Sequence, residues 1–185
     1  MNSTQPHTAV EPTIAPQKSK KPVFLIAGLL VVLALAATVV WKTTASRDLA
    51  PEVTYGLIDG NRISTSSLKG KVVLINFWAT SCVTCIAEMP KLVETHRKYS
   101  ARGYETVAVA MSYDRADYVL NFVKTRGLPF KVAMDLDGNV AEQFNKVKVT
   151  PTTLLVDTQG RILRRWVGEP DFKQLHGLIE GALPS

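Results

Sequence analysis

The two cysteines of the chain, Cys82 and Cys85, stand three positions apart at a junction between two sequence patterns. Before them, Lys71–Trp78 (KVVLINFW) is almost continuously apolar and rich in β-branched and aromatic residues, as in a strand buried on both faces. After them, residues 83–101 have the pattern of a helix that Pro90 interrupts. A Cys-x-x-Cys pair between a buried strand and the start of a helix constrains this chain more than any other feature does.

This position favours redox chemistry at Cys82. The first N–H groups of a helix are unpaired and amount to about half a positive charge, which stabilises a thiolate and lowers the thiol pKa from about 8.5. Cys85, one turn inside the helix, is expected to be more buried and to stay protonated. Cβ atoms at this spacing lie about 5–6 Å apart, whereas a disulfide needs about 3.5–4.5 Å. Closure therefore requires a local adjustment, which suits exchange better than permanent cross-linking.

Other uses of the pair are weaker interpretations. A structural disulfide across so short a loop gains little from chain entropy. Zinc needs about four ligands. His96 and His176 are the only histidines of the folded region, stand far apart in the sequence, and are interpreted as surface residues of helices. We therefore predict neither a metal site nor a cofactor.

Apolar runs and helical patterns alternate along the rest of the chain, which predicts a layered α/β fold with a mixed sheet. Two hairpins are expected, with turns at Gly60-Asn61 and at Thr158–Arg161. Asp114 is expected to cap a helix that runs to Arg126. The expected strands are 53–59, 71–78, 104–111, 130–134, 152–157 and 162–167, and the expected helices are 83–101, 114–126, 139–144 and one after Pro170.

The N-terminal region predicts a membrane segment. Val23–Val40 contains no charged residue, and with Trp41 closing the run it would form a helix about 28 Å long, which nearly spans the ~30 Å hydrocarbon core. A buried core helix would normally have alternating faces, and this run has none. The predicted segments are a cytoplasmic tail at 1–22, a transmembrane signal-anchor at 23–41, a linker at 42–50 and a folded domain at 51–185.

Charges around this segment predict its orientation. Three lysines precede it, and only Lys42 and Arg47 follow, so the positive-inside rule places the N-terminus in the cytoplasm and the folded domain outside. Disulfide chemistry is possible in that compartment. Ala34-Leu35-Ala36 resembles a signal-peptidase site, but the apolar run is longer than the usual ~7–15 residues of a secretory signal. An uncleaved anchor is the preferred interpretation.

The net charge of +6 does not indicate a nucleic-acid-binding protein. Residues 1–50 contribute +3, and residues 51–185 contribute +3 with the two signs interspersed. Because the folded region has no dense basic patch, binding to a phosphate backbone is excluded as its main function.

Further motifs surround the cysteine pair. Phe77-Trp78-Ala79 precedes it, Pro90 follows Cys85 by five residues, and Val149–Thr153 (VTPTT) precedes an apolar strand. With these motifs in this order the chain resembles thioredoxin-fold proteins. Leu68–Trp78 (LKGKVVLINFW) makes it most similar to the membrane-anchored TlpA/ResA/CcmG-like branch. The resemblance covers about residues 51–183 and implies a central mixed β-sheet flanked by helices and a protein disulfide oxidoreductase activity.

The resemblance also implies roles for single residues. Cys82 matches the nucleophile and Cys85 the resolving thiol of a redox-active disulfide. Pro151 matches a cis-proline that faces this disulfide. Thr150 would present its backbone to an extended substrate, and Trp78 is expected in the same substrate-binding region.

Glu88, three residues beyond Cys85, matches an acidic residue that handles protons in the ResA-like branch. A carboxylate near a thiolate raises the thiol pKa by like-charge repulsion. Three positions depart from common patterns: Asn76 replaces the buried Asp of thioredoxins proper, Ser81 replaces a Trp, and Thr84 replaces a Pro. Glu88 is expected to take over the function of that missing Asp.

Together these features predict a membrane-tethered thiol–disulfide oxidoreductase in the bacterial inner membrane, with its catalytic domain in the periplasm or otherwise outside the cytoplasm. Its expected substrates are disulfide-containing proteins of cytochrome c maturation or of oxidase copper-site assembly. A transmembrane reductase is the expected electron donor. The alternatives are a peroxiredoxin-like peroxidase, although its P-x-x-x-[ST]-x-x-C arrangement is absent, and a non-catalytic copper-binding assembly module that uses both thiolates.

Overall fold

The computed structural model describes residues 28, 33–34 and 49–184 of the chain. The predicted tail, most of the predicted anchor and nearly all of the predicted linker lie outside these residues. Within the part that is described, no helix is both long and apolar enough to cross a bilayer. The fold set out below is that of residues 49–184.

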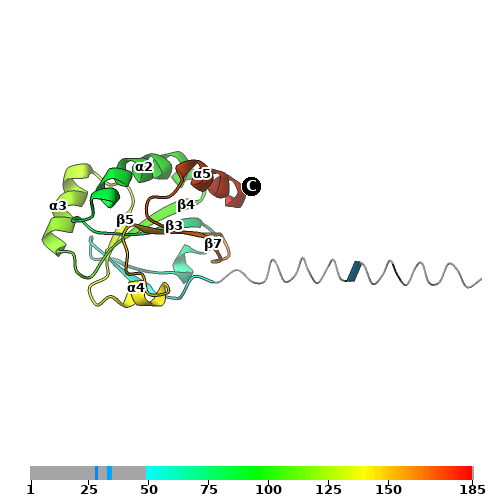
Figure 1. Cartoon of the computed structure of the whole chain (residues 1–185), viewed down its shortest axis with the longest axis horizontal. Coiled ribbons are helices and arrows are strands. Elements are labelled where there is room, and N and C mark those ends of the chain that lie inside the picture. The colour runs from blue at the N-terminus through cyan, green and yellow to red at the C-terminus, as the bar shows by residue number, and fades with distance from the viewer. Residues whose placement is uncertain (1–27, 29–32, 35–48, 185) are drawn as a thin grey trace, which may run out of the picture. The chain divides into compact units, whose positions relative to one another are not determined.

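A seven-stranded sheet with the order β2-β1-β5-β4-β3-β6-β7 forms the middle of the fold (Figure 1). Both predicted hairpins are present, one joining β1 to β2 and one joining β6 to β7. The strands are β1 (Thr54–Leu57), β2 (Arg62–Ser64), β3 (Val72–Trp78), β4 (Tyr104–Ala110), β5 (Lys131–Met134), β6 (Thr152–Val156) and β7 (Ile162–Val167).

The sheet is mixed, as the sequence predicts. The pairs β3–β4 and β4–β5 are parallel. The pairs towards the two edges, β3–β6, β6–β7, β5–β1 and β1–β2, are antiparallel. Every residue of β3, β4 and β6 is buried. This explains their nearly continuous apolar sequences, because strands covered on both faces have no polar side to present.

Helices cover both faces of the sheet. One face, with Val72, Leu74 and Trp78 of β3, packs against α2, α3 and α5, and the other packs against α4 and Leu68 (Figure 1). The bounds are α2 (Val83–Tyr99), α3 (Ala116–Arg126), α4 (Asn139–Gln143) and α5 (Phe172–Ala182), with short 3-10 turns at Ser66–Leu68 and Ser100–Arg102.

Three expectations from the sequence need correction. Helix α2 continues through Pro90 without interruption. Asp114 is not the cap of α3, because Arg115 occupies that position with no side-chain capping bond, and the Asp114 carboxylate binds Thr80 instead. His96 is not a surface residue: it is 9 % exposed and its ring packs against Phe130. The contacts of Asp114 and of His96 join segments that lie far apart in the sequence.

Candidate active site

Cys82 and Cys85 form a disulfide at the N-terminus of α2. Cys82 is the N-cap residue, and its Sγ accepts a hydrogen bond of 3.2 Å from the backbone N–H of Cys85. Cys82 is partly exposed, whereas Cys85 is fully buried. An incoming group can therefore reach Cys82 but not Cys85, and the helix N-terminus stabilises negative charge on the Cys82 sulfur.

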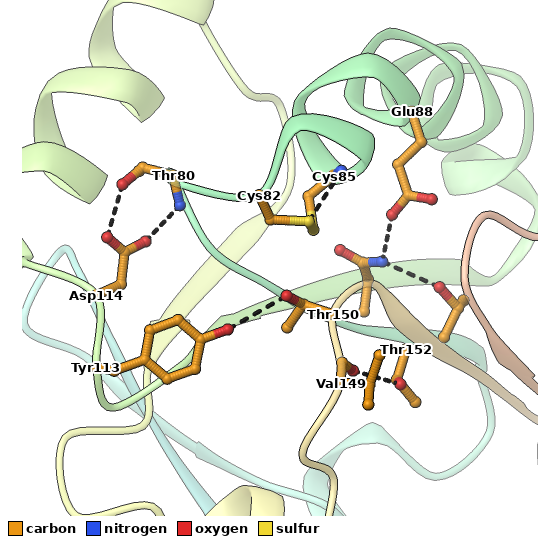
Figure 2. The surroundings of a disulfide bond; sticks show 11 residues. Thr80, Cys82, Cys85, Glu88, Tyr113, Asp114, Val149, Thr150 and Thr152 are labelled. Atoms are coloured by element: carbon orange, nitrogen blue, oxygen red, sulfur yellow. Dashed lines mark hydrogen bonds between the residues drawn. A yellow bond between two sulfur atoms is a disulfide. The ribbon is translucent and has the colours of Figure 1, made fainter.

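The loop ahead of the pair is tightly fixed. Strand β3 ends at Trp78, which is fully buried and stacks at 5.2 Å between ring centroids on Phe122 of α3. The Cys82 N–H then donates to the Ala79 carbonyl over 3.1 Å, which closes a turn between strand and helix. The Thr80 backbone N–H and hydroxyl both donate to the Asp114 carboxylate, each over 2.6 Å (Figure 2). The motif therefore starts from a rigid base.

A second loop, ahead of β6, faces the disulfide. Its Thr150–Pro151 peptide bond is cis. Thr152 pairs with Phe77 in the β3–β6 register, so Pro151 lies beside the end of β3 from which the cysteine motif starts. The Pro151 carbonyl accepts from the Gly168 N–H over 2.8 Å, which ties the loop to the residue after β7. Figure 2 shows Thr150 on the side of the disulfide away from α2.

The loop between β4 and α3, which holds Thr80 through Asp114, also contacts the loop ahead of β6 at the surface. The Tyr113 hydroxyl lies 3.2 Å from Thr150 Oγ1 (Figure 2). Tyr113 is 59 % exposed and Val149 is 56 % exposed, and Val83 between the two cysteines is 84 % exposed. Apolar surface therefore borders the disulfide, as is typical of a surface that contacts another protein.

Glu88 lies on α2 below this surface and is fully buried. Its Oε1 accepts a hydrogen bond of 2.9 Å from the Asn76 side-chain amide, which also donates a hydrogen bond of 3.0 Å to Thr153 Oγ1 (Figure 2). No described residue forms a hydrogen bond with Glu88 Oε2. Burial raises the pKa of Glu88 to about 7, while the bond from Asn76 opposes this rise. Glu88 can therefore gain or lose a proton near neutral pH.

The sequence-predicted residues occupy different depths. Cys82 and Thr150 reach the surface, whereas Cys85, Glu88 and Pro151 are buried. Trp78, predicted to be a substrate-binding residue, is fully buried, so its indole supports the motif from beneath in this oxidised conformation.

Sequence reasoning missed the residues that hold the site together. Thr80 binds Asp114 across 34 positions, and Asn76 reaches Thr153 across 77 positions. Asn76 was recognised only as a departure from the thioredoxin pattern. A polar residue at a position otherwise filled with core side chains was the one available signal.

Comparisons with known proteins agree with this geometry. A family model described as Redoxin matches residues 45–179. A thiol-disulfide oxidoreductase ResA from Bacillus thuringiensis (strain Al Hakam) is 35% identical over 136 residues, which is 73% of this chain and 77% of that protein. The ResA of Bacillus subtilis (strain 168) is 32% identical over 167 residues, 86% of this chain and 92% of that protein.

Solved structures share the fold as well. A thiol:disulfide interchange protein of the thioredoxin family from Chlorobium tepidum TLS superposes with a TM-score of 0.67 and 28% identity. The match covers 74% of this chain and 96% of that one. The thioredoxin-like fold and the activity that its cysteine pair supports are thus found together in related chains.

Proposed function

The chain belongs to the Redoxin family and is a thiol–disulfide oxidoreductase of the ResA type, and we propose that it reduces specific protein disulfides outside the cytoplasm while tethered to a membrane. The observation that carries the exchange chemistry is the cysteine pair itself: Cys82 is partly exposed at the N-terminus of α2, and its disulfide partner Cys85 is fully buried. The direction of electron flow, towards the substrate, is taken from the resemblance to the ResA-like branch.

In the first half-reaction the Cys82 thiolate attacks one sulfur of a substrate disulfide. A bond forms between Cys82 and that sulfur, the substrate S–S bond breaks, and the other substrate sulfur leaves as a thiolate that takes up a proton. Exposure of Cys82 and its place at the N-terminus of α2 support its role as the attacking group.

In the second half-reaction Cys85 resolves the mixed disulfide. Cys85 loses its proton and attacks the Cys82 sulfur, so the Cys82–Cys85 bond forms and the bond between Cys82 and the substrate sulfur breaks. The released substrate thiolate takes up a proton, and the substrate leaves as a dithiol. Two electrons have passed to the substrate, and the enzyme is left oxidised. Because Cys85 is fully buried, its thiol needs a nearby base, and ionised Glu88 one turn away is the group of the right type.

Substrate binding would use the loop around the cis peptide bond. Thr150 stands at its exposed side, and we assign its backbone to pairing with an extended segment of the substrate. Pro151, without an N–H, is buried below it and shapes the loop. Trp78 contributes by supporting the motif, because its indole lies in the core.

Tethering and location are inferred from the sequence and the relatives. We assign residues 1–22 to the cytoplasm, 23–41 to a membrane anchor, 42–50 to a linker and 51–185 to a thioredoxin-like domain in the periplasm or an equivalent compartment. Cytochrome c maturation proteins and oxidase copper-site assembly proteins are the substrates that the resemblance suggests. An oxidising compartment requires a steady supply of electrons, and a transmembrane dithiol reductase is the partner that would provide them.

Covalent trapping tests the proposal directly. Full-length Cys85→Ser is expressed in cells at the native level, and proteins joined to Cys82 are released with dithiothreitol and identified. Because the second half-reaction is blocked, we expect a small set of extracytoplasmic disulfide proteins on Cys82. The double variant Cys82→Ser/Cys85→Ser is the matched control and should retain none.

The outcomes separate the proposal from its alternatives. If only cytoplasmic proteins are trapped, the proposed location is wrong. If nothing is trapped and the purified wild type consumes hydrogen peroxide, the chain is a peroxidase. If insulin disulfides are not reduced by the dithiol form, the proposed substrate class is wrong.

A further inference from the structure

The Asp114 carboxylate accepts hydrogen bonds from the loop that leads to Cys82, and the mechanism above assigns it no role. Its Oδ2 accepts the Thr80 backbone N–H over 2.6 Å, and its Oδ1 accepts the Thr80 hydroxyl over 2.6 Å and the Arg115 N–H over 2.9 Å (Figure 2). One half-buried carboxylate thus holds both donors of a residue that lies two positions before Cys82.

The segment that carries Asp114 is itself anchored to the core. The Met111 N–H donates to the Trp78 carbonyl over 3.0 Å, and the Asp114 N–H donates to the Met111 carbonyl over 2.9 Å. Asp114 therefore connects Thr80 to the end of the β3–β4 pair, two strands in which every residue is buried.

These bonds matter more for position than for stability. Thr80 and Asp114 are both partly exposed, so water could replace either partner, and a hydrogen bond exchanged with water adds little to folding. Their geometry, in contrast, restricts the backbone immediately before the nucleophile. In the oxidised state the disulfide also holds Cys82. Reduction removes that covalent link, so the Asp114–Thr80 contacts would then be what holds the loop before Cys82.

We propose that Asp114 is a positioning residue for Cys82, holding the loop through Thr80 so that the reduced thiolate points along the line of an incoming disulfide. The proposal rests on the proposed function, because it concerns the attack of Cys82 on a disulfide. Disulfide exchange requires the three sulfurs to approach a straight line, and small misplacements of a reacting group can cost up to about a hundredfold in rate.

The experiment compares two reactions of Cys82 in the reduced, full-length, detergent-purified protein. Exchange with oxidised glutathione and with insulin depends on the direction of the sulfur. Alkylation by iodoacetamide, measured at a pH where Cys82 is fully thiolate, depends mainly on exposure. Asp114→Asn keeps the size of the side chain but removes its charge and one acceptor. Thr80→Val keeps the shape but removes only the hydroxyl.

We expect Asp114→Asn to lower both exchange rates about tenfold, while alkylation stays within about twofold of the wild type. Thr80→Val should lower exchange by about threefold, since the backbone N–H bond is retained. Thr80→Ser, which keeps both donors, should restore the wild-type rate. Asp117→Asn is the matched control, because Asp117 is an exposed aspartate nearby that binds only Arg115, and it should change neither reaction.

A double variant completes the test. If the two residues act as one unit, Thr80→Val/Asp114→Asn should be no slower than Asp114→Asn alone. Multiplied effects, wild-type exchange in Asp114→Asn, or equal losses in exchange and alkylation would each overturn the proposal. Thr80→Val provides the answer if Asp114→Asn does not fold. A wild type that exchanges with glutathione but leaves insulin intact would instead refute the proposed substrate class.

Discussion

Two glutamates of residues 49–184 are buried, near opposite ends of the sheet, and the groups around them are of opposite kinds. Glu105 is the second residue of β4 and is 5 % exposed, whereas Glu88 lies on α2 beside Asn76, near the end of β3. The groups around each one differ completely.

Glu105 is surrounded by positive charge. Lys131 forms an ion pair and a hydrogen bond with Glu105 Oε2, and Lys71 lies 3.8 Å from the same atom. The other oxygen accepts the Thr106 N–H over 3.1 Å. A buried carboxyl group with two lysines beside it and a hydrogen bond to each oxygen has a structural part. A cavity of about 360 Å³ opens at this end and lies away from the cysteine motif.

Glu88 has the Asn76 amide for a partner and forms no direct ion pair with any residue of 49–184. Its proton is therefore retained up to a pKa of about 7. Lys91, the cation one turn away, bonds instead with Glu169 at 2.6 Å. The comparison teaches that burial alone does not make a carboxylate functional. Burial without a compensating charge raises the pKa of the carboxyl group towards neutral pH, where its proton can exchange.

The first prediction has the largest expected effect. It tests whether disulfide exchange depends only on the end of the sheet that holds Glu88 and the cysteine pair. Cys82→Ser removes the nucleophile, and we expect insulin reduction to fall by at least about a hundredfold. Glu105→Gln should keep the wild-type rate within about twofold. The measurement is turnover with dithiothreitol as reductant, and an equal loss in both variants would remove the functional distinction between the two ends.

The second prediction concerns stability against pH. In the unfolded chain Glu88 ionises near its ordinary value of 4.5, whereas in the fold it keeps its proton to a pKa of about 7. Between these values the folded state binds more protons, so the free energy of unfolding falls as pH rises and stays low above 7. At about 1.4 kcal/mol per pKa unit the loss is about 3 kcal/mol.

Glu88→Gln removes this loss, because a glutamine does not titrate. Urea unfolding from pH 4 to 8 should show that the variant gains stability relative to the wild type as pH rises through 7. Parallel curves for the two proteins across this range would mean that Glu88 is not protonated in the fold.

The third prediction sharpens the comparison at the other end. Glu105→Gln leaves Lys131 without its anionic partner, which should cost about 2 kcal/mol. This is less than for a fully buried pair, because Lys131 is 34% and Lys71 48% exposed. The midpoint of urea unfolding at pH 7 measures this loss of stability in Glu105→Gln. Asp117→Asn, which breaks an exposed pair with Arg115, should leave the midpoint of unfolding unchanged and is the control.

The smallest effect is on the thiols. If ionised Glu88 repels a thiolate at Cys82 or Cys85, Glu88→Gln should let at least one thiol of the reduced protein titrate at lower pH. The three groups titrate as a coupled set, so the change belongs to the set and not to one thiol. Alkylation rate against pH is the measurement, and superimposable curves for variant and wild type would remove Glu88 from the site.

Local sequence patterns were sufficient for most of the fold. The continuous apolar strands, the turn residues and the Cys-x-x-Cys pair before a helix are all short-range signals, and each predicted strand is present. The cis bond at Pro151 followed from a resemblance and not from any local rule, since a proline before a strand is equally compatible with a trans turn.

The three predictions that were wrong, for Asp114, His96 and Pro90, failed because each depended on tertiary contacts. Asp114 was assigned to a helix cap because an aspartate before a helix usually is one, and His96 to a surface because nothing nearby marked it as buried. Thr80 and Phe130, which decide their actual roles, are distant in the sequence. Pro90 was expected to interrupt α2, but packing of α2 on the sheet outweighs the loss of one backbone hydrogen bond.

The sequence by itself determined which residues could do chemistry: two cysteines at a helix start and a glutamate one turn further on. Their spacing is a property of the helix and needs no other part of the chain. Only the tertiary structure decided what Glu88 would become. The packing of α2 on β3 excluded water from it, gave it Asn76 as a partner and left Lys91 to Glu169. The pKa of a carboxyl group depends on everything that surrounds it, and those surroundings exist only once the chain has folded.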